Sequence, residues 1–153
     1  MVRTLPHTQV DPIPAMVKAI ATRHWDFVTF YMVWPWKARL FDLDAVIEPY
    51  TLAAQSVDGL LFPAGLVWKL AWTENPDFPL YSVDDIHPSS LGSYVAALTI
   101  VATLSGRSAV GMPSDFDVDD HYLQFPEAQI PLAQWAAEAA VAASRAAGTA
   151  RVR

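Results

Sequence analysis

The chain of 153 residues contains no cysteine. This absence excludes a disulfide scaffold, a zinc site built on thiolates and a cysteine nucleophile. The four histidines lack the H-x-x-x-H spacing typical of zinc sites, and the sequence has no glycine-rich phosphate loop. We therefore expect neither a metal ion nor another cofactor.

Charged residues are also scarce. They make up 17% of the chain, whereas hydrophobic residues make up 53%, and average proteins hold about 25% charged residues. The net charge of −6 argues against nucleic acid and against an anionic membrane as partners, because both would be repelled. The longest apolar run, 91–104, is shorter than the roughly 20 residues of a spanning helix, and the N-terminus has no signal-peptide core. We expect a soluble, cytoplasmic protein.

The hydrophobic pattern alternates between helical and strand periodicity. It predicts helices over 12–23, 42–57, 65–72 and 89–105, and strands over 26–33 and 59–63, with Pro49 causing a kink or a break. This order predicts an α/β fold with a short parallel sheet flanked by helices. Only two strands are clear, which is little for an independent α/β core.

The C-terminal part has a different composition. Residues 108–130 are acidic and contain proline, which predicts an extended connector; the D-x-D-x-D run at 115–119 lacks the glycine and glutamate of a calcium loop. An alanine-rich helix is expected over 131–147, packing on the domain or serving as a dimerisation arm. Its core-facing positions are predicted to be Leu132, Trp135, Ala136, Ala139 and Ala143. We divide the chain into an α/β domain, 1–110, and a connector with C-terminal helix, 111–153.

One motif carries chemistry. In Asp84-Asp85-Ile86-His87-Pro88 the carboxylate of Asp84 can fold back onto Nδ1 of His87, which fixes the imidazole tautomer and leaves Nε2 free as a general base. Asp85 has the wrong spacing for this role. Pro88 holds His87 out of the helical region, and Ser89 or Ser90 caps the following helix. The alternative is that this pair only stabilises a turn.

The stretch 84–97, D-x-x-H-P-S-x-x-G-x-Y-x-A-A, resembles the last conserved block of SGNH (GDSL-type) hydrolases. Residues 31–35 and 62–68, the second with a Pro-x-Gly-x-x-Trp pattern, are similar to upstream segments of a bacterial branch of that family. The resemblance covers 26–106. It implies a flavodoxin-like sheet and hydrolysis of a small ester, with His87 as general base and Asp84 orienting it.

The chain departs from the family at its nucleophile and oxyanion hole. It has no Gly-Asp-Ser block, and its single asparagine, Asn75, lies outside any Gly-x-Asn-Asp block. The sequence therefore resembles an incomplete, C-terminal half of an SGNH domain. Ser82, Ser90 and Ser93 are the serines nearest to His87 that could replace the nucleophile, although each has an ordinary structural role open to it.

Two tryptophans complete the candidate site. Trp34 and Trp68 follow the predicted strands, where ligands bind in open α/β sheets, so they could line a substrate pocket or pack in the core.

The sequence therefore allows two hypotheses about function. The protein is an SGNH-like esterase, or it is a non-catalytic half-hydrolase that acts as an assembly protein. An open edge on the 26–33 strand predicts a homo-oligomer, most simply a symmetric dimer.

Overall fold

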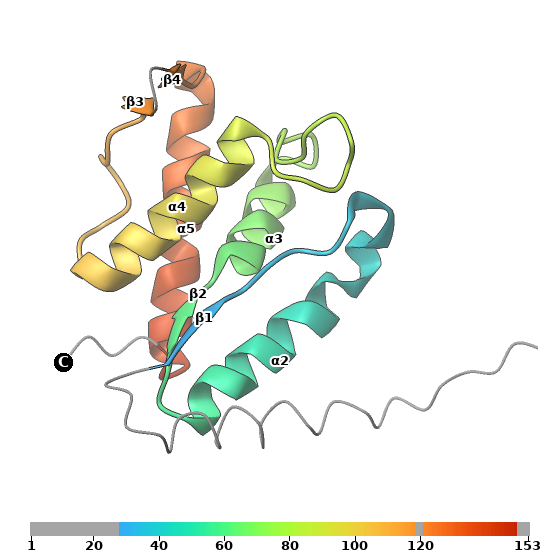
Figure 1. Ribbon diagram of the computed structural model, residues 1–153, viewed down its shortest axis with the longest axis vertical. Helices are drawn as coiled ribbons and strands as arrows, with labels where there is room; N and C mark the ends of the chain where they lie inside the picture. The colour runs from blue at the N-terminus through green and yellow to red at the C-terminus, as the bar shows by residue number, and fades with distance from the viewer. Residues whose placement is uncertain (1–27, 119–120, 150–153) are drawn as a thin grey trace, which may run out of the picture.

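The computed structural model describes residues 28–118 and 121–149. The elements in this part of the chain (Figure 1) are β1 (Thr29–Tyr31), the 3-10 helix η1 (Lys37–Asp42), α2 (Leu43–Ser56), β2 (Leu60–Phe62), α3 (Ala64–Glu74), α4 (Ser90–Ser105), β3 (Asp115–Val118), β4 (His121–Gln124), the 3-10 helix η2 (Glu127–Gln129) and α5 (Ile130–Ala146). The expected helix over 12–23 and the start of the 26–33 strand lie outside the described residues.

The two predicted strands pair in parallel, as expected. Thr29 lies opposite Leu60 and Tyr31 opposite Phe62, and the amide of Met32 continues the ladder by donating to the carbonyl of Phe62 at 3.0 Å. In Figure 1, α2 lies on one side of this sheet, and α4 and α5 lie on the other. The α/β class with a short parallel sheet flanked by helices is confirmed.

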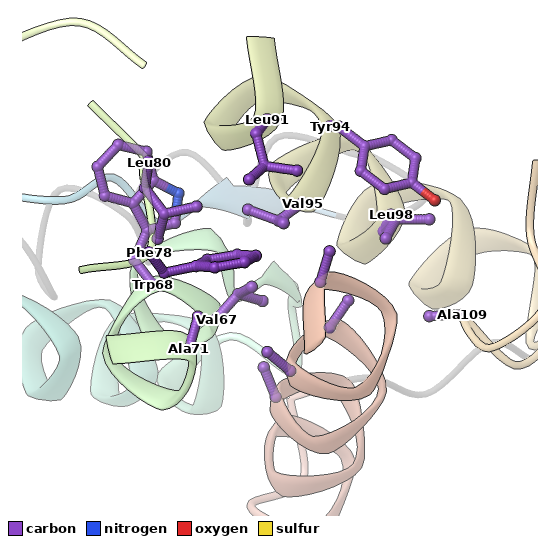
Figure 2. Close-up of a cluster of buried hydrophobic side chains, with 14 of the residues drawn as sticks. Val67, Trp68, Ala71, Phe78, Leu80, Leu91, Tyr94, Val95, Leu98 and Ala109 are labelled. Carbon is purple, nitrogen blue, oxygen red and sulfur yellow. The ribbon is translucent and has the colours of Figure 1, made fainter. Parts of the chain in front are cut away.

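The main hydrophobic core lies between α3, α4 and α5 (Figure 2). Trp68 and Val67 of α3 and Val95 of α4 are fully buried there. A smaller cluster of Met32, Ala54 and Leu61 joins the sheet to α2. Helices therefore hold most of the buried surface, while the sheet is reduced to two short strands.

Helix α5 packs on α3 and α4 of its own chain, which is the first of the two predicted roles. The predicted core face was only partly right. Ala136 is buried and Leu132 packs against the core, but Trp135 is 43% exposed and Ala143 is exposed. The buried face carries mainly small residues, with one amide side chain among them, namely Ala133, Gln134, Ala136, Ala137, Ala140, Val141 and Ser144. Alanines allow close helix contact, so the large indole is displaced to the surface.

The connector holds an antiparallel hairpin, β3–β4, with Phe116 opposite Leu123. The sequence predicted only an extended segment, because the acidic composition obscured the alternation of Asp115, Phe116 and Asp117. Helix α5 anchors the start of the connector, since Glu138 Oε2 accepts hydrogen bonds from Ser108 Oγ at 3.0 Å and from the Ala109 amide at 2.7 Å.

Helix ends follow the sequence more closely. Ser89 caps α4 by accepting a hydrogen bond from the Gly92 amide at 3.0 Å, and Gly106 ends that helix at φ 69°. Pro49 lies inside α2, which continues through it rather than breaking. No helix in the described residues is long and apolar enough to cross a membrane.

Candidate active site

The loop that carries Asp84 and His87 joins α3 to α4 and is closed at its base. Tyr81 and Pro88 form an antiparallel bridge, and the Ser82 amide donates to the His87 carbonyl at 2.9 Å. Asp85 turns the chain at φ 57°, a left-handed conformation that aspartate tolerates better than most residues. The turn brings the residues on either side of Asp85 together.

Asp84 folds back onto His87 in the geometry that the spacing predicts. Its Oδ2 lies 2.6 Å from His87 Nδ1, and its Oδ1 accepts hydrogen bonds from the amides of Ile86 and His87 at 3.0 and 2.9 Å. The hydrogen bond with His87, then those from Ser82 and the two amides, hold the pKa of Asp84 well below its usual range. An ionised Asp84 favours the tautomer that carries its proton on Nδ1, so Nε2 of neutral His87 is the acceptor.

The imidazole faces solvent. The side chain of His87 is 76% exposed, and none of the described residues forms a hydrogen bond with Nε2. A neutral imidazole in this state can accept a proton from water or from an incoming hydroxyl.

The three serines near His87 do not reach Nε2. Ser82 Oγ donates to Asp84 Oδ1 at 2.6 Å, so it supports the carboxylate rather than contacting the imidazole. Ser90 and Ser93 are exposed on the first turn of α4. The described part of the chain thus presents an oriented base without a serine bonded to it.

The two predicted substrate-binding tryptophans lie against each other. Their rings stack with centroids 3.8 Å apart. Trp68 is fully buried and its Nε1 has no hydrogen-bond partner in the described residues, whereas Trp34 is half-buried. Only Trp34 presents surface to a ligand, and Trp68 packs in the core beneath it.

This stack belongs to an aromatic cluster that supports the loop. Trp68 contacts Trp72 and Tyr81 edge to face, at centroid distances of 5.3 and 4.8 Å. The hydroxyl of Tyr81 donates to the carbonyl of Pro35, in the segment after β1. The base of the loop is therefore fixed to α3 and to the segment that follows β1.

Lys37 is a further contact that sequence reasoning missed. Its Nζ donates to Asp85 Oδ1 at 2.8 Å, and its amide donates to the Asp85 carbonyl at 3.0 Å. The two residues are 48 positions apart, so no local spacing could have indicated the contact. Both bonds fix the position of Asp85, the turn residue that lies between Asp84 and His87 in the sequence.

Within residues 28–118 and 121–149, no three histidine, aspartate or glutamate side chains gather as they would around a metal ion. Comparison with known proteins found no matching family model, no matching curated protein and no matching solved structure.

Proposed function

We propose that the chain is an ester hydrolase of SGNH type, in which His87 acts as general base and Asp84 orients it. The observation that carries the proposal is the 2.6 Å contact between Asp84 Oδ2 and His87 Nδ1, with Nε2 left open. The resemblance of residues 84–97 to the catalytic block of SGNH hydrolases supports it. A complete domain of that family would have further strands in the sheet.

The chemistry follows from the open Nε2. Water bound to Nε2 loses a proton to it as the oxygen attacks the ester carbonyl. The imidazolium then returns the proton to the leaving alkoxide, so that an acid and an alcohol are formed. The negative charge of Asp84 stabilises the imidazolium between these steps. Water is the nucleophile in this scheme because no serine of the described chain contacts Nε2.

Hydrolysis of p-nitrophenyl acetate tests the proposal. A general base contributes roughly 10²–10⁴-fold to rate, so His87→Ala should lower kcat/KM by at least about 100-fold. An exposed histidine hydrolyses activated esters weakly by itself, so Asp84→Asn is the sharper variant. It keeps the imidazole but removes its orienter, and it should lower kcat/KM by at least about tenfold.

Serine variants separate water attack from a serine nucleophile. Ser90→Ala and Ser93→Ala should retain the parental rate if water attacks. Collapse of the rate in either variant would assign a serine nucleophile instead. Parental activity in both His87→Ala and Asp84→Asn would contradict the role of the pair.

A second candidate function is assembly of a non-catalytic half-hydrolase, and the edge of β1 favours it. The Leu60 amide donates to the Val28 carbonyl, and the Met32 amide donates to the Phe62 carbonyl. By the alternation of a ladder, the backbone groups of Phe30 then face β2, and those of Thr29 and Tyr31 point to the other side. No described residue pairs with that side, and Tyr31 and Val33 are 41% and 42% exposed. Such an edge is a template for strand addition.

We propose that the strand added at this edge belongs to a second copy, giving a symmetric dimer. Light scattering at micromolar concentration should report twice the chain mass. Tyr31→Lys, which places a charge at the edge, should shift the protein to monomer, whereas Leu104→Lys on α4 should not. A monomeric parent would refute this assembly.

A further inference from the structure

A pocket of about 900 Å³ opens beside the Asp84–His87 loop. One wall is formed by η1 and the first residues of α2, and the other by the end of α3, residues 76–83 and Asp85. Figure 1 shows these segments at the same end of the molecule. The volume lies within the roughly 300–1,000 Å³ range of small-molecule sites.

More than half of the residues that line the pocket are aromatic or aliphatic. Phe78 and Leu80 line it from the core and are almost fully buried, so they offer a ligand little surface. Trp72 and Tyr81 stand as a stacked pair, with centroids 5.5 Å apart, and Phe41 adds a ring that is 81% exposed. The indole nitrogen of Trp72 is already bound to the Phe78 carbonyl at 2.9 Å. These surfaces suit a ring or a branched apolar group.

The charges around the pocket are largely paired. Lys37 forms an ion pair with Asp85, and Lys69 forms one with Asp44. Asp77 also lines the pocket, and no lysine or arginine of the described chain pairs with it. The lining therefore carries one negative charge in excess and no free cation, which disfavours an anionic ligand.

The pocket is joined to the candidate catalytic pair through Ser82. Ser82 lines the pocket, and its Oγ donates to Asp84 Oδ1 at 2.6 Å. The other oxygen of the same carboxylate contacts His87. Asp84 and His87 do not line the pocket themselves, so an occupant would lie beside them with Ser82 between.

From this placement we infer that the pocket binds the uncharged, ring-sized apolar group of a neutral ester. Assigning that group to an ester rests on the proposed function, whereas binding of the apolar group does not. The product of hydrolysis that carries a carboxylate would be repelled by the excess negative charge, so the site discriminates ester from acid.

Two matched probes test the inference without turnover. We expect 2-acetylnaphthalene, a neutral ketone that cannot be hydrolysed, to bind and to shift the NMR signals of the Trp72 indole and the Ser82 amide. The anionic analogue 2-naphthoate should bind at least tenfold more weakly. Asp77→Asn should strengthen the binding of 2-naphthoate and so reduce the difference in affinity between the two probes. Equal or tighter binding of 2-naphthoate by the parent would overturn the inference.

Substitutions in the lining locate the site. Thr73 is an exposed lining residue, so Thr73→Trp should fill the pocket without disturbing the core and weaken 2-acetylnaphthalene binding at least tenfold. Phe41→Ala should weaken it several-fold. Leu104→Trp, a similar enlargement on α4 outside the pocket, is the control and should bind as the parent does. Unchanged binding in both Thr73→Trp and Phe41→Ala would refute the location.

The failure of this inference can be distinguished from failure of the proposed function. His87→Ala should lose hydrolysis of methyl 2-naphthoate but still bind 2-acetylnaphthalene. If the parent binds 2-acetylnaphthalene but hydrolyses no ester, the pocket is supported and the proposed hydrolase activity is refuted. If the parent hydrolyses p-nitrophenyl acetate but does not bind 2-acetylnaphthalene, the hydrolase activity is supported and the pocket is refuted as the substrate site.

Discussion

Gly92 on α4 and Leu80 before the Asp84–His87 loop approach so closely that a Cβ at position 92 would lie 2.2 Å from the Leu80 carbonyl oxygen. The same Cβ would lie 2.9 Å from Cζ2 of Trp68. The carbonyl also accepts a hydrogen bond from the Ser89 amide at 2.8 Å. The start of α4, the base of the loop and the buried indole therefore meet at one point, and only glycine fits there.

Gly92→Ala should destabilise the protein by at least about 2 kcal/mol, because the clash is with backbone and with a fully buried ring. Urea unfolding followed by tryptophan fluorescence measures this. Ser93→Ala, at the next and exposed position, is the matched control and should change the unfolding free energy by less than about 0.5 kcal/mol. Similar stabilities of the two variants would mean that the contact is relieved without cost.

Asp84 should make stability depend on acid pH. The hydrogen bonds from His87, Ser82 and the amides lower its pKa in the folded state, relative to about 3.9 when unfolded. Its contribution is therefore present above about pH 4 and is lost as pH falls through the lower, folded pKa. Asparagine does not titrate, so the parent should exceed Asp84→Asn in unfolding free energy at pH 7, and the gap should shrink by pH 3. A gap that is constant with pH would contradict this assignment.

Tyr81 should make the stability of the protein depend on pH in the alkaline range. Burial, and then the negative charge of Asp85, raise the pKa of Tyr81 to about 12, from about 10 in unfolded chains. A raised folded pKa stabilises the protein below about pH 10, and this contribution is lost as pH rises through about 12. Tyr81→Phe should flatten the decline in unfolding free energy over this window. An unchanged alkaline profile would show that other groups dominate it.

The left-handed turn at Asp85 predicts a contrast between two substitutions. Asp85→Asn keeps a residue that tolerates φ 57° and loses only an exposed ion pair, which costs less than about 1 kcal/mol. Asp85→Val puts a β-branched residue into that conformation and should cost about 1–3 kcal/mol. The same urea titration separates them. Because the turn positions Asp84 relative to His87, the valine variant should also hydrolyse p-nitrophenyl acetate more slowly than the asparagine variant.

The local features of the fold could be predicted from the sequence. Ser89, Pro88 and Gly106 mark the limits of α4, and the apolar runs at 26–33 and 59–63 locate the two strands. The return of Asp84 to His87 follows from a three-residue spacing, which fixes the geometry within one short loop. In each case the determining contacts are close in sequence.

The contacts that were missed are long-range or depend on packing. Lys37 reaches Asp85 across 48 positions, and the pocket exists only because η1 and α2 lie opposite the end of α3. The face of α5 was misjudged because hydrophobicity singled out Trp135, whereas close packing selects alanine at Ala133, Ala137 and Ala140. The size of side chain that a helix contact requires cannot be deduced from the sequence of one helix, because it depends on the helix that packs against it.

One contact at the far side of the sheet bears on how copies can join. The amide of Leu61 donates to the carbonyl of Thr149 at 2.8 Å, so the chain's own C-terminal region occupies β2 on the side away from β1. Within residues 28–118 and 121–149, the outer edge of β1 is therefore the side of this sheet that has no backbone partner. If two copies paired through that edge, as proposed above, each would cover the edge of the other, and the β1–β2 sheet would present no further edge to a third copy.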